Sequence, residues 1–253
     1  MPWAMCERRP CLPVAALAAW LAVAAAAAGA AEPHADLLRR SDISSLAPES
    51  FRARLLVTPA SGQPQQLEVW RAGESRTLVR FLAPKDRGKY LLRLEDALYF
   101  LSPRAKNAVK LDPAYRLGAA SLDEMLGTRY SRDYAIESAS DAEDAGGALV
   151  VLELKARNPK APWLRVRYVV RRELQRPVRV EFRAASGKTT GSVAFVEWQE
   201  QGRLRPRRLH ISDALRPKRS ADVAIQEVEE RSVPSGLFDL TDPSERRKLE
   251  ASE

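Results

Sequence analysis

The chain of 253 residues is poor in cysteine and histidine. Both cysteines, Cys6 and Cys11, precede an apolar run near the start, so a mature form that lacks this run has no thiol, disulfide or cysteine metal ligand. The two histidines, His34 and His210, lie far apart in the sequence and belong to no HExxH pattern. The sequence therefore predicts no metal site and no cofactor.

Motifs for catalysis and nucleotide binding are also absent. The chain has no GxSxG, no P-loop and no GxGxxG. Adjacent carboxylates, such as Asp123 with Glu124, are typical of a solvated surface rather than of a catalytic acid and base. We therefore predict no catalytic residues and expect a protein that is not an enzyme.

The first 31 residues have the three parts of a cleavable export signal. Arg8 and Arg9 precede an apolar run from Leu12 to Ala28, and small residues follow in Gly29-Ala30-Ala31. This run contains Pro13 and is shorter than the roughly 20 apolar residues of a spanning helix, which favours cleavage over anchoring. No cysteine follows it, so we expect an unlipidated, soluble protein in the periplasm, with residues 32–253 as a single domain.

Alternating apolar and polar residues predict an antiparallel meander through most of the remaining chain. Turn residues such as Ser186-Gly187 and Gln201-Gly202 separate the runs. The predicted strands are Phe51–Leu55, Leu67–Arg71, Thr77–Ala83, Lys89–Leu94, Ala97–Ser102, Ala108–Leu111, Leu149–Arg157, Leu164–Arg171, Val178–Ala184, Gly191–Trp198, Pro206–Ala214 and Ala221–Glu229.

The strand beginning at Leu164 shows how the sheet is layered. Val166, Tyr168 and Val170 fall on one face, and arginines fall on the other, because strand side chains alternate. One face of the sheet is therefore apolar and buried, and the other is polar and exposed to solvent. The apolar face must be covered by another layer, by helices, or by the curling of the sheet itself.

Two helices are expected beside the strands. Residues His34–Ser41 are amphipathic, and Ser44-Ser45 marks the predicted end of that helix. Residues Ser121–Gly127 read as a short helix with a serine cap and a terminal glycine. Alternation is missing between Asp112 and Ser140, and Asp141–Gly147 reads as a polar turn.

Three local motifs resemble the LolA-like outer-membrane lipoprotein-sorting proteins. They are Arg80-Phe81-Leu82-Ala83-Pro84-Lys85-Asp86-Arg87-Gly88, Leu98-Tyr99-Phe100-Leu101-Ser102-Pro103 and Gly127-Thr128-Arg129-Tyr130-Ser131-Arg132-Asp133-Tyr134. The resemblance spans residues 35–245. The sequence departs from the family pattern at Leu98-Tyr99-Phe100, where many relatives have tryptophan, and at Arg132, where an acidic or aromatic residue is common.

The resemblance implies a mainly β fold with a few helices. It would be a strongly curved, open antiparallel half-barrel of about 11 strands, lidded by short helices, whose concave apolar face holds acyl chains. We expect this lipid-binding face to include Leu92, Leu94, Phe100, Leu152, Leu154, Val166, Tyr168, Val170, Val180 and Phe182. The same residues would form a tightly packed core if no ligand enters.

Three functions are compatible with these sequence features. The first is a monomeric periplasmic carrier or chaperone for lipoproteins or lipids, with acyl chains as ligand and an inner-membrane transporter and an outer-membrane acceptor as partners. The second is an interaction or sensor module that binds a membrane protein. The third is a lipid hydrolase. Nucleic acid is not expected as a partner, because aromatic residues are sparse among the basic ones.

Overall fold

The computed structural model describes residues 33–105, 107–112, 115–117, 120–126, 128–159, 161–199, 202 and 204–251. The expected export signal lies outside these residues, and so does Gly127, the predicted end of the second helix.

Thirteen strands form one antiparallel sheet. They are β1 (Ser50–Pro59), β2 (Gln65–Ala72), β3 (Arg76–Phe81), β4 (Tyr90–Leu94), β5 (Ala97–Leu101), β6 (Val109–Leu111), β9 (Tyr134–Asp144), β10 (Gly147–Ala156), β11 (Arg165–Arg171), β12 (Arg176–Arg183), β13 (Thr189–Gln199), β14 (Arg205–Asp213) and β15 (Ala221–Glu230). A separate two-stranded pair is formed by β7 (Arg116–Leu117) and β8 (Ala120–Ser121).

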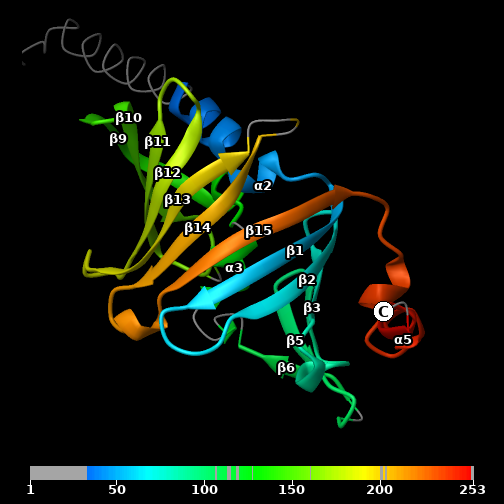
Figure 1. Cartoon of the computed structure of the whole chain (residues 1–253). Coiled ribbons are helices and arrows are strands. Elements are labelled where there is room, and N and C mark those ends of the chain that lie inside the picture. Colours follow the sequence, from blue (N-terminus) through cyan, green and yellow to red (C-terminus); the bar gives the residue numbers. More distant parts are fainter. Residues whose placement is uncertain are drawn as a thin grey trace, which may run out of the picture.

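Pairing between β1 and β15 joins two meanders into this sheet. The strand order is β6-β5-β4-β3-β2-β1-β15-β14-β13-β12-β11-β10-β9, so β6 and β9 are the free edges and the sheet is not closed. Figure 1 shows the sheet curling around an inner side. The predicted mainly β, open antiparallel half-barrel is confirmed, with slightly more strands than the expected number.

Among the strands of the main sheet, only β9 is missing from the twelve predicted by alternation, and the short β7 and β8 lie in the same segment, where the sequence predicts no strand. The residues of β9 after Tyr134 are mostly exposed, because an edge strand has one neighbour and little packing on either face. Its residues are therefore mostly polar and show no apolar alternation by which the sequence could reveal the strand. The strand continues to Asp144, so the predicted polar turn from Asp141 is shorter than expected.

Register shifts accompany the curvature of the second meander. They occur where β9 pairs with β10, β11 with β12, β12 with β13, and β13 with β14, and again where β15 pairs with β1. A β-bulge bends a strand and increases its twist, so these shifts help to curl the sheet.

Short helices accompany the sheet. They comprise residues 33–41, α2 (Ile43–Leu46), α3 (Leu122–Leu126), α4 (Tyr130–Asp133), α5 (Ser244–Ala251) and the 3₁₀ turns η1 (Pro84–Asp86), η2 (Pro217–Arg219) and η3 (Ser235–Phe238). The first helix matches its predicted span, but α2 follows it because Asp42 caps a new helix before Ser44.

The serine cap predicted for the mid-chain helix is confirmed as a capping box. The Ser121 hydroxyl accepts from the Glu124 nitrogen at 3.2 Å, and the Ser121 nitrogen donates to the Glu124 carboxylate at 2.7 Å. This reciprocal pair fixes the start of α3, which lies against the inner side of the sheet (Figure 1).

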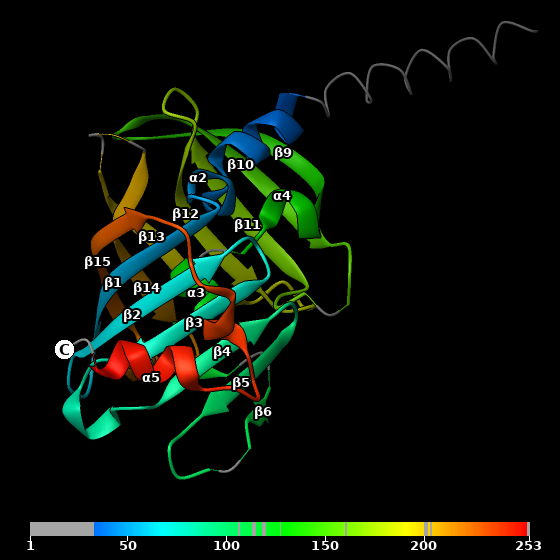
Figure 2. The same ribbon diagram turned by 90° about the vertical axis from the view of Figure 1, so that its right-hand side faces the viewer.

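The sheet has a hydrophobic core on each side. The inner core contains residues from both meanders, together with Leu38, Met125 and Tyr130 from the helices. The outer core lies between β2–β5 and the C-terminal segment, where Leu237 and Phe238 of η3 pack on the sheet. Figure 2 shows α5 lying across the outer side of β2 and β3.

Candidate lipid-binding face and its closing helices

Seven of the ten predicted site residues lie together on the inner face of β10, β11 and β12. Strand pairing places Leu152 opposite Tyr168, and Tyr168 opposite Val180, so the three strands present one continuous apolar surface. All seven have exposed fractions of 1% or less and belong to the inner core: Leu152, Leu154, Val166, Tyr168, Val170, Val180 and Phe182.

The other three predicted residues divide between the two faces. Phe100 packs against the inner core, as predicted. Leu92 and Leu94 instead belong to the outer core, so their assignment to the concave face is wrong. Tyr90, Leu91 and Leu92 are all buried, because β4 is covered on both sides, and hydrophobicity alone does not distinguish its faces.

Aromatic and apolar side chains from the helices fill the space above this face. The ring of Tyr130 in α4 lies 5.0 Å from the ring of Tyr168 and 5.8 Å from that of Tyr134, measured between centroids. Leu38 and Met125 are buried in the same cluster. These side chains cover the apolar face, so a ligand would reach it only if the helices moved.

A buried carboxylate ties the first helices to α4. Asp42 has no exposed surface, and its carboxylate accepts from the Ser131 nitrogen at 2.8 Å and the Ser131 hydroxyl at 2.7 Å. Its other oxygen accepts from the nitrogen and hydroxyl of Ser44. Burial raises the pKa of Asp42 above its ordinary value, although these hydrogen bonds act in the opposite direction.

A second hydrogen bond joins the first helix directly to the apolar face. The Tyr168 hydroxyl donates to the Ser41 carbonyl at 2.7 Å, so a residue of the candidate binding face holds the helix end. We refer to Ser41, Asp42, Ser131 and Tyr168 as the latch. Sequence analysis missed it, although an aspartate just before Ile43-Ser44-Ser45 is the usual signal of a helix N-cap.

Trp163 covers another part of the inner face. Its ring stacks on Phe182 with centroids 3.7 Å apart and an interplanar angle of 11°. The Tyr134 hydroxyl donates to the Trp163 carbonyl at 3.0 Å and fixes this segment, which precedes β11. The sequence gives Trp163 no periodic pattern, because it lies in the loop between two strands.

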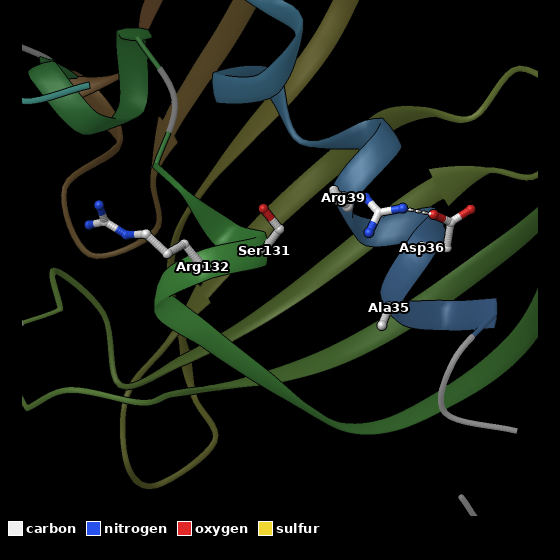
Figure 3. A pocket seen from close by; sticks show the side chains of 5 residues that line it. All are labelled: Ala35, Asp36, Arg39, Ser131 and Arg132. Carbon is white, nitrogen blue, oxygen red and sulfur yellow. Dashed lines mark hydrogen bonds and ion pairs between the residues drawn. The ribbon is translucent and has the colours of Figure 1, made fainter. Parts of the chain in front are cut away.

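An open pocket of about 580 Å³ lies outside the latch (Figure 3). It is lined by Ala35, Asp36, Arg39, Ser131 and Arg132. Asp36 and Arg39 form an ion pair at one side, and Figure 3 shows them on the helix that faces α4. Because Ser131 also binds Asp42, the pocket reaches the place where the first helix and α4 are joined.

The outer face of the second meander is charged, as its sequence predicts. Arg183 lies within ion-pair distance of Glu181 on its own strand, β12, and of Glu153 on β10, across the intervening β11. His210 pairs with Asp222 at 2.8 Å, and alternation with the buried Leu209 places it on this outer face. Within the described part of the chain, no three histidine, cysteine or acidic residues cluster as metal ligands, and no helix is long and apolar enough to cross a membrane.

This architecture, an open curled sheet with helices on its inner side, is shared with solved structures. A LolA superfamily protein from Nitrosomonas europaea superposes with a TM-score of 0.71 at 20% identity, over 81% of this chain and 96% of that chain. A DUF1329 family protein from Desulfovibrio piger gives 0.68 at 11% identity, over 83% and 97%. A domain from Vibrio parahaemolyticus, described as an outer membrane lipoprotein-sorting protein, gives 0.65 at 14% identity, over 85% and 95%.

The fold is therefore LolA-like, and the resemblance seen in the sequence is confirmed. A family model described only as an uncharacterized protein matches residues 73–242, and the chain belongs to that family. Comparison with curated proteins gives no match.

Proposed function

We propose that this protein is a periplasmic carrier that shields the acyl chains of a lipoprotein or a lipid on the inner face of its half-barrel. The observation that carries the proposal is the apolar surface of β10–β12, covered by helical segments of which α2, α3 and α4 have four or five residues each. Short helices have little stability of their own, so they depend on the contacts that hold them down.

The latch provides such contacts in a form that can be reversed. Hydrogen bonds to Asp42 and from Tyr168 contribute about 1 kcal/mol each, far less than a covalent link. Each buried CH₂ group of an incoming acyl chain contributes about 0.8 kcal/mol. A chain of ordinary length can therefore replace the contacts that Met125 and Tyr130 lose when the helices move.

Export and domain organisation are part of the same proposal. Residues 1–31 would direct the chain to the periplasm and be removed, which leaves residues 32–253 as one unanchored, monomeric domain. An inner-membrane donor and an outer-membrane acceptor would then be its partners. No chemical reaction is required of such a carrier.

The filled inner face favours a second candidate, an interaction module that binds a membrane protein. If Leu38, Met125 and Tyr130 are permanent parts of the core, the inner face holds no ligand. Binding would then use the charged outer face or the exposed edges β6 and β9.

Lipid extraction from the protein purified from cells separates the two candidates. For a carrier, mass spectrometry finds bound lipid, and the delipidated protein takes up a fluorescent acyl probe. Absence of lipid together with no probe uptake overturns the carrier and favours the interaction module.

Two valine substitutions provide a matched comparison. Val166→Phe adds bulk to the inner face, whereas Val196→Phe adds it at an exposed position on β13. We expect Val166→Phe to reduce probe uptake and Val196→Phe to leave it unchanged. Thermal unfolding of both variants checks that the inner substitution has not simply unfolded the protein, because overpacking costs about 1–3 kcal/mol.

A further inference from the structure

Arg71 is a buried cation on the inner face of β2, with an exposed fraction of 7%. Its Nε donates to the Gly73 carbonyl at 3.1 Å. Among the described residues this is the one hydrogen bond of its side chain, and no carboxylate forms an ion pair with it. Buried charges in proteins are normally paired, so this arrangement is unusual for a purely structural arginine.

Two of the neighbours of Arg71 are also arginines, Arg93 and Arg129. Strand pairing places Thr77 beside Arg71 and Arg93 beside Thr77, on the same face of three adjacent strands. Arg129, which precedes α4, is also within electrostatic range. Burial lowers the pKa of Arg71 and the charge of Arg129 lowers it further, whereas Glu74 acts in the opposite direction; the guanidinium remains protonated.

The nearest carboxylates are engaged by other groups. Asp123 binds Arg93 through both oxygens, each at 2.8 Å. Glu74 lies 3.4 Å from Arg129 and is largely exposed. Asp42 accepts four hydrogen bonds from Ser44 and Ser131. None of these acids forms an ion pair with Arg71, although Glu74 and Asp42 favour its charged form through space.

Arg71 also lies next to the latch. Asp42 is within its electrostatic range, and Ser131, which binds Asp42, lines the pocket of Figure 3. Arg132 also lines this pocket, so separation of Ser131 from Asp42 would join the pocket to the surroundings of Asp42, which include Arg71. The charged end of a ligand would then meet arginines while its chains contact the apolar strands.

We infer that Arg71, assisted by Arg129, binds the phosphate of an amphiphile whose acyl chains occupy the inner face of β10–β12. This inference rests on the proposed carrier function and narrows its ligand to an anionic phospholipid. The lipid anchor of a lipoprotein carries no phosphate, so it would leave Arg71 without a partner. Arginine suits the role because its planar guanidinium presents several donors to one phosphate.

Competition between a bound fluorescent acyl probe and two lipids of equal chain length tests the inference. Dioctanoyl phosphatidic acid carries the phosphate, and dioctanoylglycerol lacks it. We expect the full mature protein to bind the phosphatidic acid at least about tenfold more tightly, since charge-assisted hydrogen bonds are the stronger ones. Arg71→Gln should reduce this ratio to about one.

Arg54→Gln is the matched control, because Arg54 lies on a neighbouring strand but is exposed and pairs with Glu227. It should keep the wild-type ratio. If Arg71→Gln fails to fold, Arg129→Gln replaces it and should lower the ratio in the same direction. Inorganic phosphate alone, tested by the shift in melting temperature, should have no effect that depends on Arg71.

The outcomes are distinct. Equal binding of the two lipids, or a ratio unchanged by both Arg71→Gln and Arg129→Gln, overturns the inference while leaving the carrier intact. Arg71-dependent stabilisation by inorganic phosphate as strong as that by the phosphatidic acid identifies a free-anion site and also overturns it. Failure of both lipids to displace a probe that binds, or failure of the probe to bind, contradicts the carrier itself.

Discussion

The carboxylate of Asp42 accepts two hydrogen bonds from Ser131, at 2.8 and 2.7 Å, and thereby joins the N-terminal helices to α4. The two residues are 89 positions apart in the sequence. Their contact fastens the helical cover over the apolar face, so in the proposed carrier its strength would set how readily the cover opens.

Asp42→Ala is expected to loosen this cover. The substitution removes four hydrogen bonds and leaves the Ser131 nitrogen without its partner, which costs about 1–3 kcal/mol of unfolding free energy. Stopped-flow measurement should show faster uptake of the acyl probe. Asp36→Ala, which removes partly exposed ion pairs, is the control and should change stability by under about 1 kcal/mol. An uptake rate equal to that of the wild type would show that the latch does not limit opening.

The same carboxylate predicts a pH dependence of stability. Burial raises the folded-state pKa of Asp42 above its ordinary value of 3.8, so ionisation is less favourable in the folded chain than in the unfolded one. Its contribution to stability is complete below pH 3.8 and is lost as pH rises through the raised folded pKa. Asp42→Asn removes this titration.

Urea unfolding of both proteins at a series of pH values measures this effect. The wild type should lose stability relative to Asp42→Asn as pH increases across that window. A free-energy difference that stays constant with pH would mean that Asp42 titrates alike in the folded and unfolded states.

Glu68 has a structural role on the opposite face of the sheet. Its carboxylate is 2% exposed and accepts from Arg52 at 2.7 Å and from the Trp70 indole at 2.9 Å, with Arg80 at 3.5 Å. Glu68→Ala should cost about 3–5 kcal/mol, because it leaves buried positive charge without this acid.

Chemical denaturation measures the loss, and Glu227→Ala, at an exposed pair, should cost under about 1 kcal/mol. In Glu68→Ala protein that remains folded, the amount of probe bound at saturation should equal that of the wild type, because Glu68 faces away from the inner core. Reduced capacity would link the outer network to the binding face.

Alternation of apolar and polar residues predicted the inner face best in strands whose outer face is exposed to solvent. Arg167 alternates with Val166 and Tyr168 in β11, and the structure places the apolar pair inward. In β4 both faces are buried, because η3 and α5 cover the outer one. Leu92 and Leu94 were therefore assigned to the wrong face. Alternation identifies two faces of a strand but does not say which one meets a distant segment.

The latch and the outer core depend on contacts between segments remote in sequence. Asp42 meets Ser131, and Tyr90 donates to the Glu250 carboxylate at 2.6 Å. Nothing in the local sequence around either pair specifies its partner. The capping box of α3 could be predicted because Ser121 and Glu124 are three residues apart, and helix geometry brings them together.

The most direct test of the account uses the two tryptophans that lie on opposite faces. Trp163 stacks on Phe182 in the inner core, whereas Trp70 belongs to the outer core. Variants with Trp198→Phe and either Trp70→Phe or Trp163→Phe isolate each reporter in the mature chain. Phospholipid with brominated acyl chains should quench the fluorescence of Trp163 and leave the fluorescence of Trp70 unchanged. Quenching of Trp70 alone, or no quenching of Trp163 at saturating lipid, would contradict acyl-chain binding on the inner face.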